Sequence, residues 1–226
     1  MYAVNAFMVA FLVRYHHLSL PQSTWITAWV LGAVGVLGLL LGGWASDRLS
    51  RGRPKGRLLL AAGTMLAAAP AIFLALRLEP GQIAWFTLLM GAGSALIFVY
   101  YSCVYPAIHD VIESGLRGTA MALYFFAMYV LGASFGPVAT GALSDFFALR
   151  AMTASGASAM TEACKAAGLH TAMHVIPLLC ALLSVVLWAA SRSVGRDMAR
   201  LKAWRLREER QSGLALPRRA PPKPNS

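Results

Sequence analysis

The chain has 226 residues, of which 58% are hydrophobic and 13% are charged, whereas about 25% of the residues of a typical soluble domain are charged. One soluble core of this size has no room for so much apolar surface, so the composition excludes a soluble globular protein and predicts an integral membrane protein. The formal net charge of +11 would suit a nucleic-acid partner, but membrane topology accounts for the basic residues and makes nucleic-acid binding an unneeded hypothesis.

Five stretches without Asp, Glu, Lys or Arg are long enough to cross the roughly 30 Å hydrocarbon layer of a bilayer as helices. They are residues 24–44, 58–76, 83–107, 118–143 and 171–190. A sixth apolar stretch, 1–13, would span only about 18 Å at about 1.5 Å per residue. It has neither the basic start nor the cleavage site of a signal peptide. We therefore expect it to be the outer half of a helix whose beginning is missing.

Basic residues are distributed unequally between the two sides of this predicted bundle. All but four of the 20 Lys and Arg lie in three regions: between residues 44 and 58, at residue 117, and after residue 190. Alternating helices place these three regions on one side of the membrane. The other side keeps Arg14, Arg77, Arg150 and Lys165. Because basic residues beside spans mark the cytoplasmic face, the pattern predicts a multi-pass protein with a cytoplasmic C-terminus. We expect its location to be a bacterial inner (plasma) membrane.

The chain is expected to divide into a transmembrane bundle, 1–192, and two further segments. In 193–213 apolar residues recur at near-helical spacing among basic ones, which predicts an amphipathic helix lying on an anionic cytoplasmic leaflet. A solvated basic tail is the alternative. Residues 214–226 contain four prolines and are predicted to be disordered. A short surface helix is expected around 160–167, in the connection before the last span.

The connection between the first and second full spans carries the most specific motif. Residues 42–53 have the sequence Gly-Gly-Trp-Ala-Ser-Asp-Arg-Leu-Ser-Arg-Gly-Arg, which resembles the G-x-x-x-D-R/K-x-G-R-R/K loop, motif A, of the major facilitator superfamily. The match departs from the family pattern where Ser-Arg-Gly-Arg replaces Gly-Arg-Arg. The alternative is a cytoplasmic loop that collects arginine without a specific role. The resemblance singles out Gly43, Asp47, Arg48, Arg51 and Arg53.

The residue types in this motif have physical uses of their own. Small residues let a helix end pack closely against its neighbours. Asp47 can accept hydrogen bonds or cap a neighbouring helix N-terminus, where the dipole favours a carboxylate. In the family, the corresponding carboxylate locks one half of the transporter against the other. By resemblance, Asp47 would therefore contact a helix that this chain lacks.

The fifth span contains a second motif that is independent of the first. A Gly-Pro pair with further glycines resembles the G-P-x-x-x-G stretch, motif C, which is tied to gating in the superfamily. Glycines one turn apart allow close helix contact, and proline removes a backbone hydrogen bond and permits a kink. An ordinary glycine-rich helix interface is the alternative. The residues concerned are Arg117, Gly132, Gly136, Pro137, Gly141 and Asp145.

The amino-acid sequences of these segments are most similar to those of spinster-like members, which show R-x-T-A-x-A-L, G-x-x-x-G-P and L-x-S-D in this order. Residues 1–192 would then correspond to the seventh to twelfth helices of that plan. The resemblance implies an all-α fold, a six-helix half of a transporter bundle with its first helix truncated. It also implies a secondary-active carrier in which two half-bundles rock around a site at the midplane. The partners would be the lipid bilayer and either the missing N-terminal half or a second copy.

Substrate contacts must come from uncharged polar groups, because no charged residue lies within the predicted spans. By resemblance, the seventh, tenth and eleventh helices face the cavity, and polar residues on these helices become candidates for lining it. Each has an ordinary alternative, since tyrosines anchor at membrane interfaces or pack, and Asn hydrogen-bonds across helices. The candidates are Asn5, Tyr100, Tyr101, Tyr105, Tyr124 and Tyr129.

The histidines and cysteines predict neither a metal site nor a cofactor. The histidines lie in loops or at interfaces without a third ligand, and the cysteine spacing matches no metal motif. His109 and Asp110 end the fourth span, where they form either a protonation site or, more simply, a solvated helix end.

Three classes of function remain to be weighed. A carrier of small organic or lipid-like solutes leads, and its substrate, coupling ion and direction are not encoded in any visible motif. A truncated membrane remnant or interaction module without transport is the alternative. An intramembrane enzyme is disfavoured, because no Ser/His or paired-carboxylate set falls at bilayer depth. We therefore predict no enzymatic activity.

Overall fold

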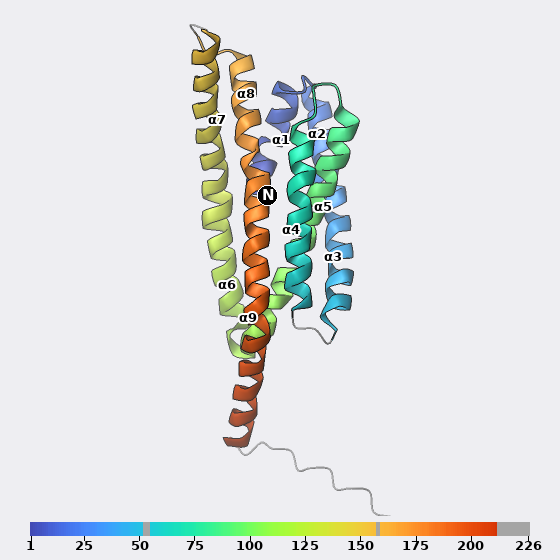
Figure 1. The fold of residues 1–226 in the computed structure, drawn as a ribbon, viewed down its shortest axis with the longest axis vertical. Helices are drawn as coiled ribbons and strands as arrows, with labels where there is room; N and C mark the ends of the chain where they lie inside the picture. The colour runs from blue at the N-terminus through green and yellow to red at the C-terminus, as the bar shows by residue number, and fades with distance from the viewer. Residues whose placement is uncertain (52–54, 157–158, 212–226) are drawn as a thin grey trace, which may run out of the picture.

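The computed structural model describes residues 1–51, 55–156 and 159–211. This part of the chain is a bundle of roughly aligned helices without strands (Figure 1). The first elements are α1 (Tyr2–Arg14), α2 (Leu20–Ala28), a π-helical turn (Trp29–Ala33), α3 (Val34–Ser50), α4 (Gly56–Leu76) and α5 (Ile83–Val111). A short 3-10 turn (Ser114–Leu116) leads into α6 (Arg117–Ala127), a second π-helical turn (Met128–Ser134), α7 (Phe135–Ser155), α8 (Glu162–Met173) and α9 (Val175–Gln211).

The predicted all-α membrane bundle is confirmed. Within the described residues, five helical stretches are long and apolar enough to cross a membrane, and α1 is a shorter apolar helix beside them. Leu20–Ser50 and Ser114–Ser155 each form one rod that contains a π-helical turn. These rods exceed the predicted stretches 24–44 and 118–143, because the helices continue past the apolar stretches into polar residues. At the start of α2, for example, the Ser19 backbone N–H donates to Gln22 Oε1 over 3.3 Å.

The C-terminal third contains two segments for which the sequence predicts a helix. The short helix expected around 160–167 corresponds to α8, which is longer and packs along α7. The basic segment 193–213 is, through Gln211, a helical continuation of α9. It contains no proline to stop the helix. The tail predicted to be disordered, 214–226, lies outside the described residues.

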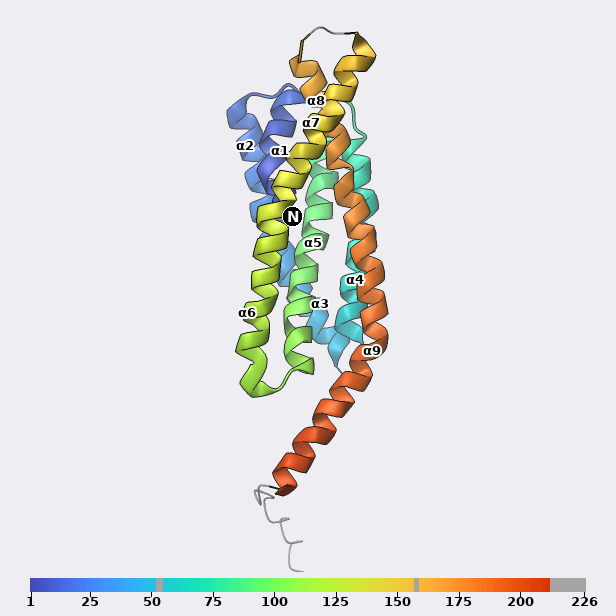
Figure 2. The ribbon, with the colours of Figure 1, turned by 90° about the vertical axis from the view of Figure 1, so that its left-hand side faces the viewer.

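The two ends of the bundle differ in charge. The α3–α4 and α5–α6 connections lie at the end from which α9 protrudes, and we call this the basic end (Figures 1 and 2). The α1–α2, α4–α5 and α7–α8 connections lie at the opposite end. Four arginines lie over an aromatic ring one helical turn earlier, at centroid distances of 3.7–5.7 Å. The pairs are Trp44–Arg48 and Trp188–Arg192 at the basic end, and Phe73–Arg77 and Phe146–Arg150 at the opposite end.

Such pairs are suited to the membrane–water boundary, where an aromatic ring sits at headgroup depth and a long cationic side chain reaches toward water. Their presence at both ends, on α3, α4, α7 and α9, therefore marks the two surfaces of the hydrocarbon layer on this protein. All four aromatic rings belong to side chains that are more than a third exposed on the outside of the bundle.

The core is formed mainly by α4 and α5, with α3, α9 and α1 packed around them. Its largest fully buried side chains are Met8, Phe11, Met65, Ile72, Phe86 and Met90. Because lipid tails are as apolar as these side chains, close van der Waals packing holds the helices together rather than transfer from water. α3 approaches α5 through glycine: a Cβ on Gly38 would lie 2.5 Å from the Ala95 carbonyl oxygen.

The rod Ser114–Ser155 is packed differently from the rest of the bundle. In α6 and the π-helical turn after it, the structure buries no residue. Large apolar side chains such as Leu123, Phe126, Leu131 and Val138 are each at least 64% exposed there. This rod contacts the bundle chiefly through α8 at the opposite end. Most of its surface therefore faces lipid or another protein segment.

Candidate functional site

A cavity of about 420 Å³ lies at mid-height of the bundle, next to the start of α1. Its wall combines α1, α5, the second π-helical turn, α7 and α9 with one residue of α4, Met65. Among the described residues that line it, none is Asp, Glu, Lys or Arg. Polar lining is supplied chiefly by Tyr2, Tyr100, Tyr101 and Thr140. The cavity therefore offers apolar walls, aromatic faces and a few hydroxyl groups to a solute.

Beside this cavity the aromatic residues of α1, α5, α6 and the second π-helical turn form a continuous cluster. On α5, the Tyr101 ring lies 5.2 Å from that of Tyr100 and 5.7 Å from that of Tyr105. Tyr105 contacts Tyr124 of α6 at 5.6 Å, and the hydroxyl groups of Tyr100 and Tyr124 are 3.4 Å apart. The fold thus brings residues of two spans together, although about 20 residues separate them along the chain.

The cluster extends to residues that the sequence analysis did not single out. Phe125 lies 5.6 Å from Tyr105 and 6.4 Å from Tyr129, and Tyr129 lies 6.2 Å from Tyr2 of α1. Five of the six candidates, all tyrosines, are therefore in one cluster, but only Tyr100 and Tyr101 line the cavity itself. Asn5 is exposed on α1 and is not a lining residue. Tyr101 and Tyr105 are one helical turn apart, and this spacing in the sequence indicates that the two side chains share a helix face.

The motif C-like rod forms one wall of the cavity. Gly132 and Gly136 are lining residues, and a Cβ on Gly132 would lie 3.3 Å from the Tyr2 ring. Pro137 has no N–H to donate to the carbonyl one turn earlier. The π-helical turn Met128–Ser134 ends just before Pro137, so the regular pattern of α-helical hydrogen bonds is interrupted beside the cavity.

The other residues of that motif lie apart from the cavity. A Cβ on Gly141 would be 3.5 Å from the Phe7 ring, so this glycine accommodates α1. Arg117 starts α6 at the basic end, and Asp145 is exposed on α7 toward the opposite end. About 28 helical residues separate the two, or about 40 Å. They do not form a common site.

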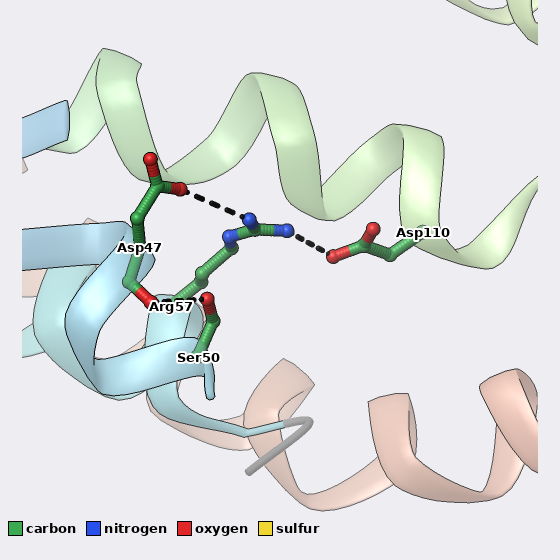
Figure 3. A network of polar contacts seen from close by, with 4 residues as sticks. All are labelled: Asp47, Ser50, Arg57 and Asp110. Atoms are coloured by element: carbon green, nitrogen blue, oxygen red, sulfur yellow. Dashed lines mark hydrogen bonds and ion pairs between the residues drawn. The ribbon is translucent and has the colours of Figure 1, made fainter. Parts of the chain in front are cut away.

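At the basic end, an ion-pair network joins three helices (Figure 3). The Arg57 guanidinium, on the first turn of α4, donates to Asp110 Oδ2 near the end of α5 and, over 3.2 Å, to Asp47 Oδ1 near the end of α3. The Ser50 hydroxyl donates to the Asp47 carbonyl oxygen over 3.0 Å. The Arg57 side chain is 18% exposed, whereas that of Asp47 is 71% exposed. Arg57 therefore holds the ends of α3 and α5 together from α4.

The motif A-like residues are divided by this arrangement. Asp47 joins the network, whereas Arg48 lies over Trp44, 5.7 Å from its ring centroid. Arg51 is exposed after the end of α3, and Arg53 lies outside the described residues.

Gly43, the glycine that matches the motif, has nothing within 4 Å of a built Cβ, so it provides no close helix contact in this bundle. Its neighbour Gly42 provides that contact instead, since a Cβ there would lie 2.8 Å from Val99 Cα.

Sequence reasoning missed Arg57 and treated Asp110 chiefly as a solvated helix end. The two residues are 53 positions apart, and nothing local connects them. The sequence signal is the order of the spans. Asp110 lies near the end of one span and Arg57 in the first turn of another, and alternating spans place both at the same end of the bundle.

A histidine cluster occupies the opposite end. His16, in the loop after α1, is buried among the rings of Phe11, Tyr15 and Phe86 at centroid distances of 4.8–5.5 Å. Burial lowers the pKa of His16 to about 4. His170 stacks on Tyr15 at 4.4 Å, and its Nε2 lies 2.7 Å from the Leu76 carbonyl oxygen. Among the described residues, no group of three or more His, Cys, Asp or Glu is placed to hold a metal ion.

The chain is similar to known proteins in sequence and in fold. Residues 1–137 match the family model described as the Major Facilitator Superfamily. An MFS-type efflux pump of Mycolicibacterium smegmatis is 31% identical over 198 residues, which are 87% of this chain and 42% of the pump. Protein spinster homolog 3 of Homo sapiens is 32% identical over 116 residues, 51% of this chain and 23% of the relative.

A solved structure has the same fold. It is a bacterial homolog of the human lysosomal transporter spinster in an inward-facing and unoccupied conformation. The TM-score is 0.72 at 20% identity, over 87% of this chain and 45% of the solved chain. The chain thus spans less than half the length of the curated relatives and of the solved structure that it matches.

Proposed function

The chain belongs to the major facilitator superfamily and is spinster-like, and from this premise we propose that it is one half of a secondary-active carrier. The carrier would move small organic or lipid-like solutes by alternating access. The observation that carries the proposal is the tyrosine-rich cavity at mid-height of the bundle, where carriers built from two half-bundles place their substrate site. We assign no enzymatic activity to it.

The lining of the cavity favours an amphipathic solute. Its described walls are largely apolar and carry no charged side chain, so no side chain there forms an ion pair with a compact charged metabolite. The aromatic faces of Tyr100 and Tyr101 suit an alkyl chain or ring, and tyrosine hydroxyl groups supply hydrogen bonds at the edge. A charged headgroup would find its counter-charge on the other half of the carrier. The MFS-type efflux pump of Mycolicibacterium smegmatis supports an export direction.

The unpacked rod Ser114–Ser155 supports the need for a second half. α6 and the following π-helical turn bury no described residue, yet Gly132 and Gly136 on this rod line the cavity. A transporter cannot leave its substrate cavity open to lipid, so another helical segment must close it. That segment would be an N-terminal half-bundle or a second copy of this chain.

The orientation follows from the charges. The basic end would face the cytoplasm of a bacterial inner membrane, because flanking cations are retained on that side. The network of Asp47, Arg57 and Asp110 would then lie at the cytoplasmic mouth. There it would keep α3, α4 and α5 together as one rigid body while the carrier rocks. The exposed Asp47 carboxylate would remain available to the other half.

Solute binding tests the cavity directly. The chain in phospholipid nanodiscs is titrated with a fluorescent single-chain lysophospholipid, and the dissociation constant is measured. Tyr101→Ala should weaken binding about three- to tenfold, as loss of an aromatic contact does. Tyr15→Ala, at the opposite end, is the matched control and should leave the constant unchanged. Equal constants for both variants and the unaltered chain would refute the cavity as the substrate site.

The genomic sequence upstream of the Met1 codon tests the half-carrier proposal. An in-frame continuation with six further hydrophobic spans would supply the first half, and gradient-driven transport should then require both halves. A stop codon would leave a second copy as the partner. If vesicles that contain only the 226-residue chain transport no solute and contain only monomers, the alternative of a membrane remnant without transport would stand in its place.

A further inference from the structure

α9 is much longer than a membrane crossing requires. Its 37 residues, Val175–Gln211, compare with the roughly 20 that cross the hydrocarbon layer. The Arg192 guanidinium lies 3.7 Å from the Trp188 ring centroid and marks the membrane boundary on this helix. Figures 1 and 2 show α9 continuing beyond the other helices at the basic end. The part after Arg192 is therefore outside the hydrocarbon and runs away from it along the helix axis. At about 1.5 Å per residue, Arg196, Arg200 and Arg207 lie about 6, 12 and 22 Å beyond Arg192.

Arginines recur on one face of this extension. We call Arg192, Arg196, Arg200 and Arg207 the arginine stripe. At 3.6 residues per turn their Cα atoms lie within a sector of about 80° around the helix axis. All four side chains are exposed. Residues 193–208 contain five basic and two acidic residues, so the extension is cationic as a whole.

The face across the helix from the stripe packs on the protein. Val194 is 5% exposed and belongs to the core cluster, and the partly buried Met198 packs against that cluster. Leu201, on the same face, is also partly buried. The inward face is therefore occupied, and this fixes the rotation of the extension. The stripe must point away from the bundle.

Nearer the start of α9, the side of the helix that carries the arginine stripe faces lipid. Leu178, Leu182 and Val185 precede Arg192 by 14, 10 and 7 residues, and these spacings place them in the same 80° sector. Each is at least 60% exposed. One continuous helix face thus changes from leucine and valine to arginine at Trp188, the residue that marks the boundary.

We propose that the start of the arginine stripe, Arg192 and Arg196, binds the phosphate groups of anionic lipids in the leaflet at the basic end. These two residues lie within the headgroup layer, which is roughly 5–7 Å thick on each side. A face that contacts acyl chains above the boundary meets the headgroups of the same lipids below it. Guanidinium groups donate paired hydrogen bonds to phosphate oxygens. Each cation near an anionic surface strengthens attachment by roughly fivefold. The stripe therefore gives this helix a preference for anionic over zwitterionic lipid.

Hydrogen exchange on the full chain tests the proposal. The chain is placed in nanodiscs of phosphatidylcholine alone, or with phosphatidylglycerol, and exchange of the backbone amides of 193–200 is followed by mass spectrometry. We expect exchange to be about tenfold slower in the anionic discs and this difference to disappear at 1 M salt. Amides of 90–104 in α5 report whether the bundle remains folded.

The variants separate the start of the stripe from total charge. Arg192→Gln and Arg196→Gln together should abolish the difference between the two kinds of disc, and glutamine keeps a similar helix propensity. Arg200→Gln and Arg207→Gln remove the same charge farther from the membrane and should leave most of the difference. Equal loss in both variants would overturn the proposal, as would equal exchange in the two kinds of disc. Protection by inorganic phosphate or a short RNA in phosphatidylcholine discs would also overturn it, since the ligand would then be no lipid.

Discussion

Arg57 is the residue on which the basic end of the bundle depends most. Its guanidinium is largely buried between Asp47 and Asp110, and the pairs join α4 to α3 and to α5. Only the Arg57 side chain is largely shielded from water, since those of Asp47 and Asp110 are 71% and 37% exposed. Each pair alone therefore adds little to stability, and Arg57 matters because it serves both pairs. The network is thus a structural clasp whose central residue is the sensitive one.

Replacing Arg57 should reveal this asymmetry. Arg57→Gln leaves two carboxylates without their shared cation and should lower the free energy of unfolding by about 0.5–2 kcal/mol, as the loss of two exposed ion pairs does. Unfolding by denaturant in mixed micelles measures it. Adding Asp110→Asn to Arg57→Gln should restore part of the loss, since one uncompensated charge disappears. If the double variant is less stable than Arg57→Gln, the network does not act through charge.

His16 gives the opposite end a pH dependence of known sign. Burial among Phe11, Tyr15 and Phe86 lowers its pKa to about 4, against about 6.5 in an unfolded chain. Below pH 6.5 the unfolded chain therefore binds the proton first, and stability falls as the pH drops from about 6.5 to about 4. Above pH 6.5 the contribution is complete and constant.

The His16 effect should be measurable as a loss of up to about 3 kcal/mol near pH 4 relative to pH 7. Thermal unfolding between pH 7.5 and pH 4.5 follows it. His16→Phe fills the same aromatic site without a titrating group and should flatten this dependence. The exposed neighbour His17 is the control, because His17→Asn should leave it intact. Equal pH dependence in His16→Phe and the unaltered chain would assign the effect to other groups.

At the scale of elements, α3 and α5 depend on glycine for their close approach. Gly42 faces the α5 backbone, whereas Gly43, the residue that matches the family motif, faces open space. The same substitution at these two adjacent positions should therefore have opposite effects, because a Cβ at Gly42 meets backbone atoms and a Cβ at Gly43 meets nothing.

Gly42→Ala should destabilise the chain by about 1–3 kcal/mol, since helices must separate or bend to admit the methyl group. Gly43→Ala should be neutral or stabilise by up to about 1 kcal/mol, because alanine is the better helix former. The midpoint of thermal unfolding in detergent compares the two. A loss in Gly43→Ala as large as that in Gly42→Ala would contradict the packing of α3 on α5.

At the scale of the whole molecule, charge and aromatic residues define two surfaces. The basic end carries the α3–α4 connection and the extension of α9, and the opposite end carries the histidine cluster. Arginine–aromatic pairs lie at both boundaries. The bundle is thereby fixed in depth, and the excess of cations at one end is what would fix its direction.

Labelling from one side of the membrane tests that direction. With Cys103, Cys164 and Cys180 replaced by alanine, Glu79→Cys should react with an impermeant maleimide in intact spheroplasts. Lys55→Cys should react only after permeabilisation. Both positions are exposed in the bundle, so access depends on the membrane alone. Labelling of Lys55→Cys in intact spheroplasts would reverse the proposed orientation.

By itself, the sequence determined the membrane class, the spans and the family. A helix needs about 20 apolar residues to cross the bilayer, so hydropathy finds the crossings without knowledge of any contact. The motifs at 42–53 and 132–141 lie within single segments and are visible in the same way. The boundaries of the helices were less accessible, because capping residues such as Ser19 lie beyond the apolar stretch.

Only the tertiary structure decided which side chains meet. The rotation of each helix about its axis selects Gly42 over Gly43, pairs Arg57 with Asp110 across 53 residues, and gathers the tyrosines of α5 and α6. Nothing local in the sequence sets this rotation, because lipid accepts almost any apolar face. It is set by the packing of all the helices together, and that packing places Asp47 beside Arg57 and the arginine stripe beneath the lipid-facing side of α9.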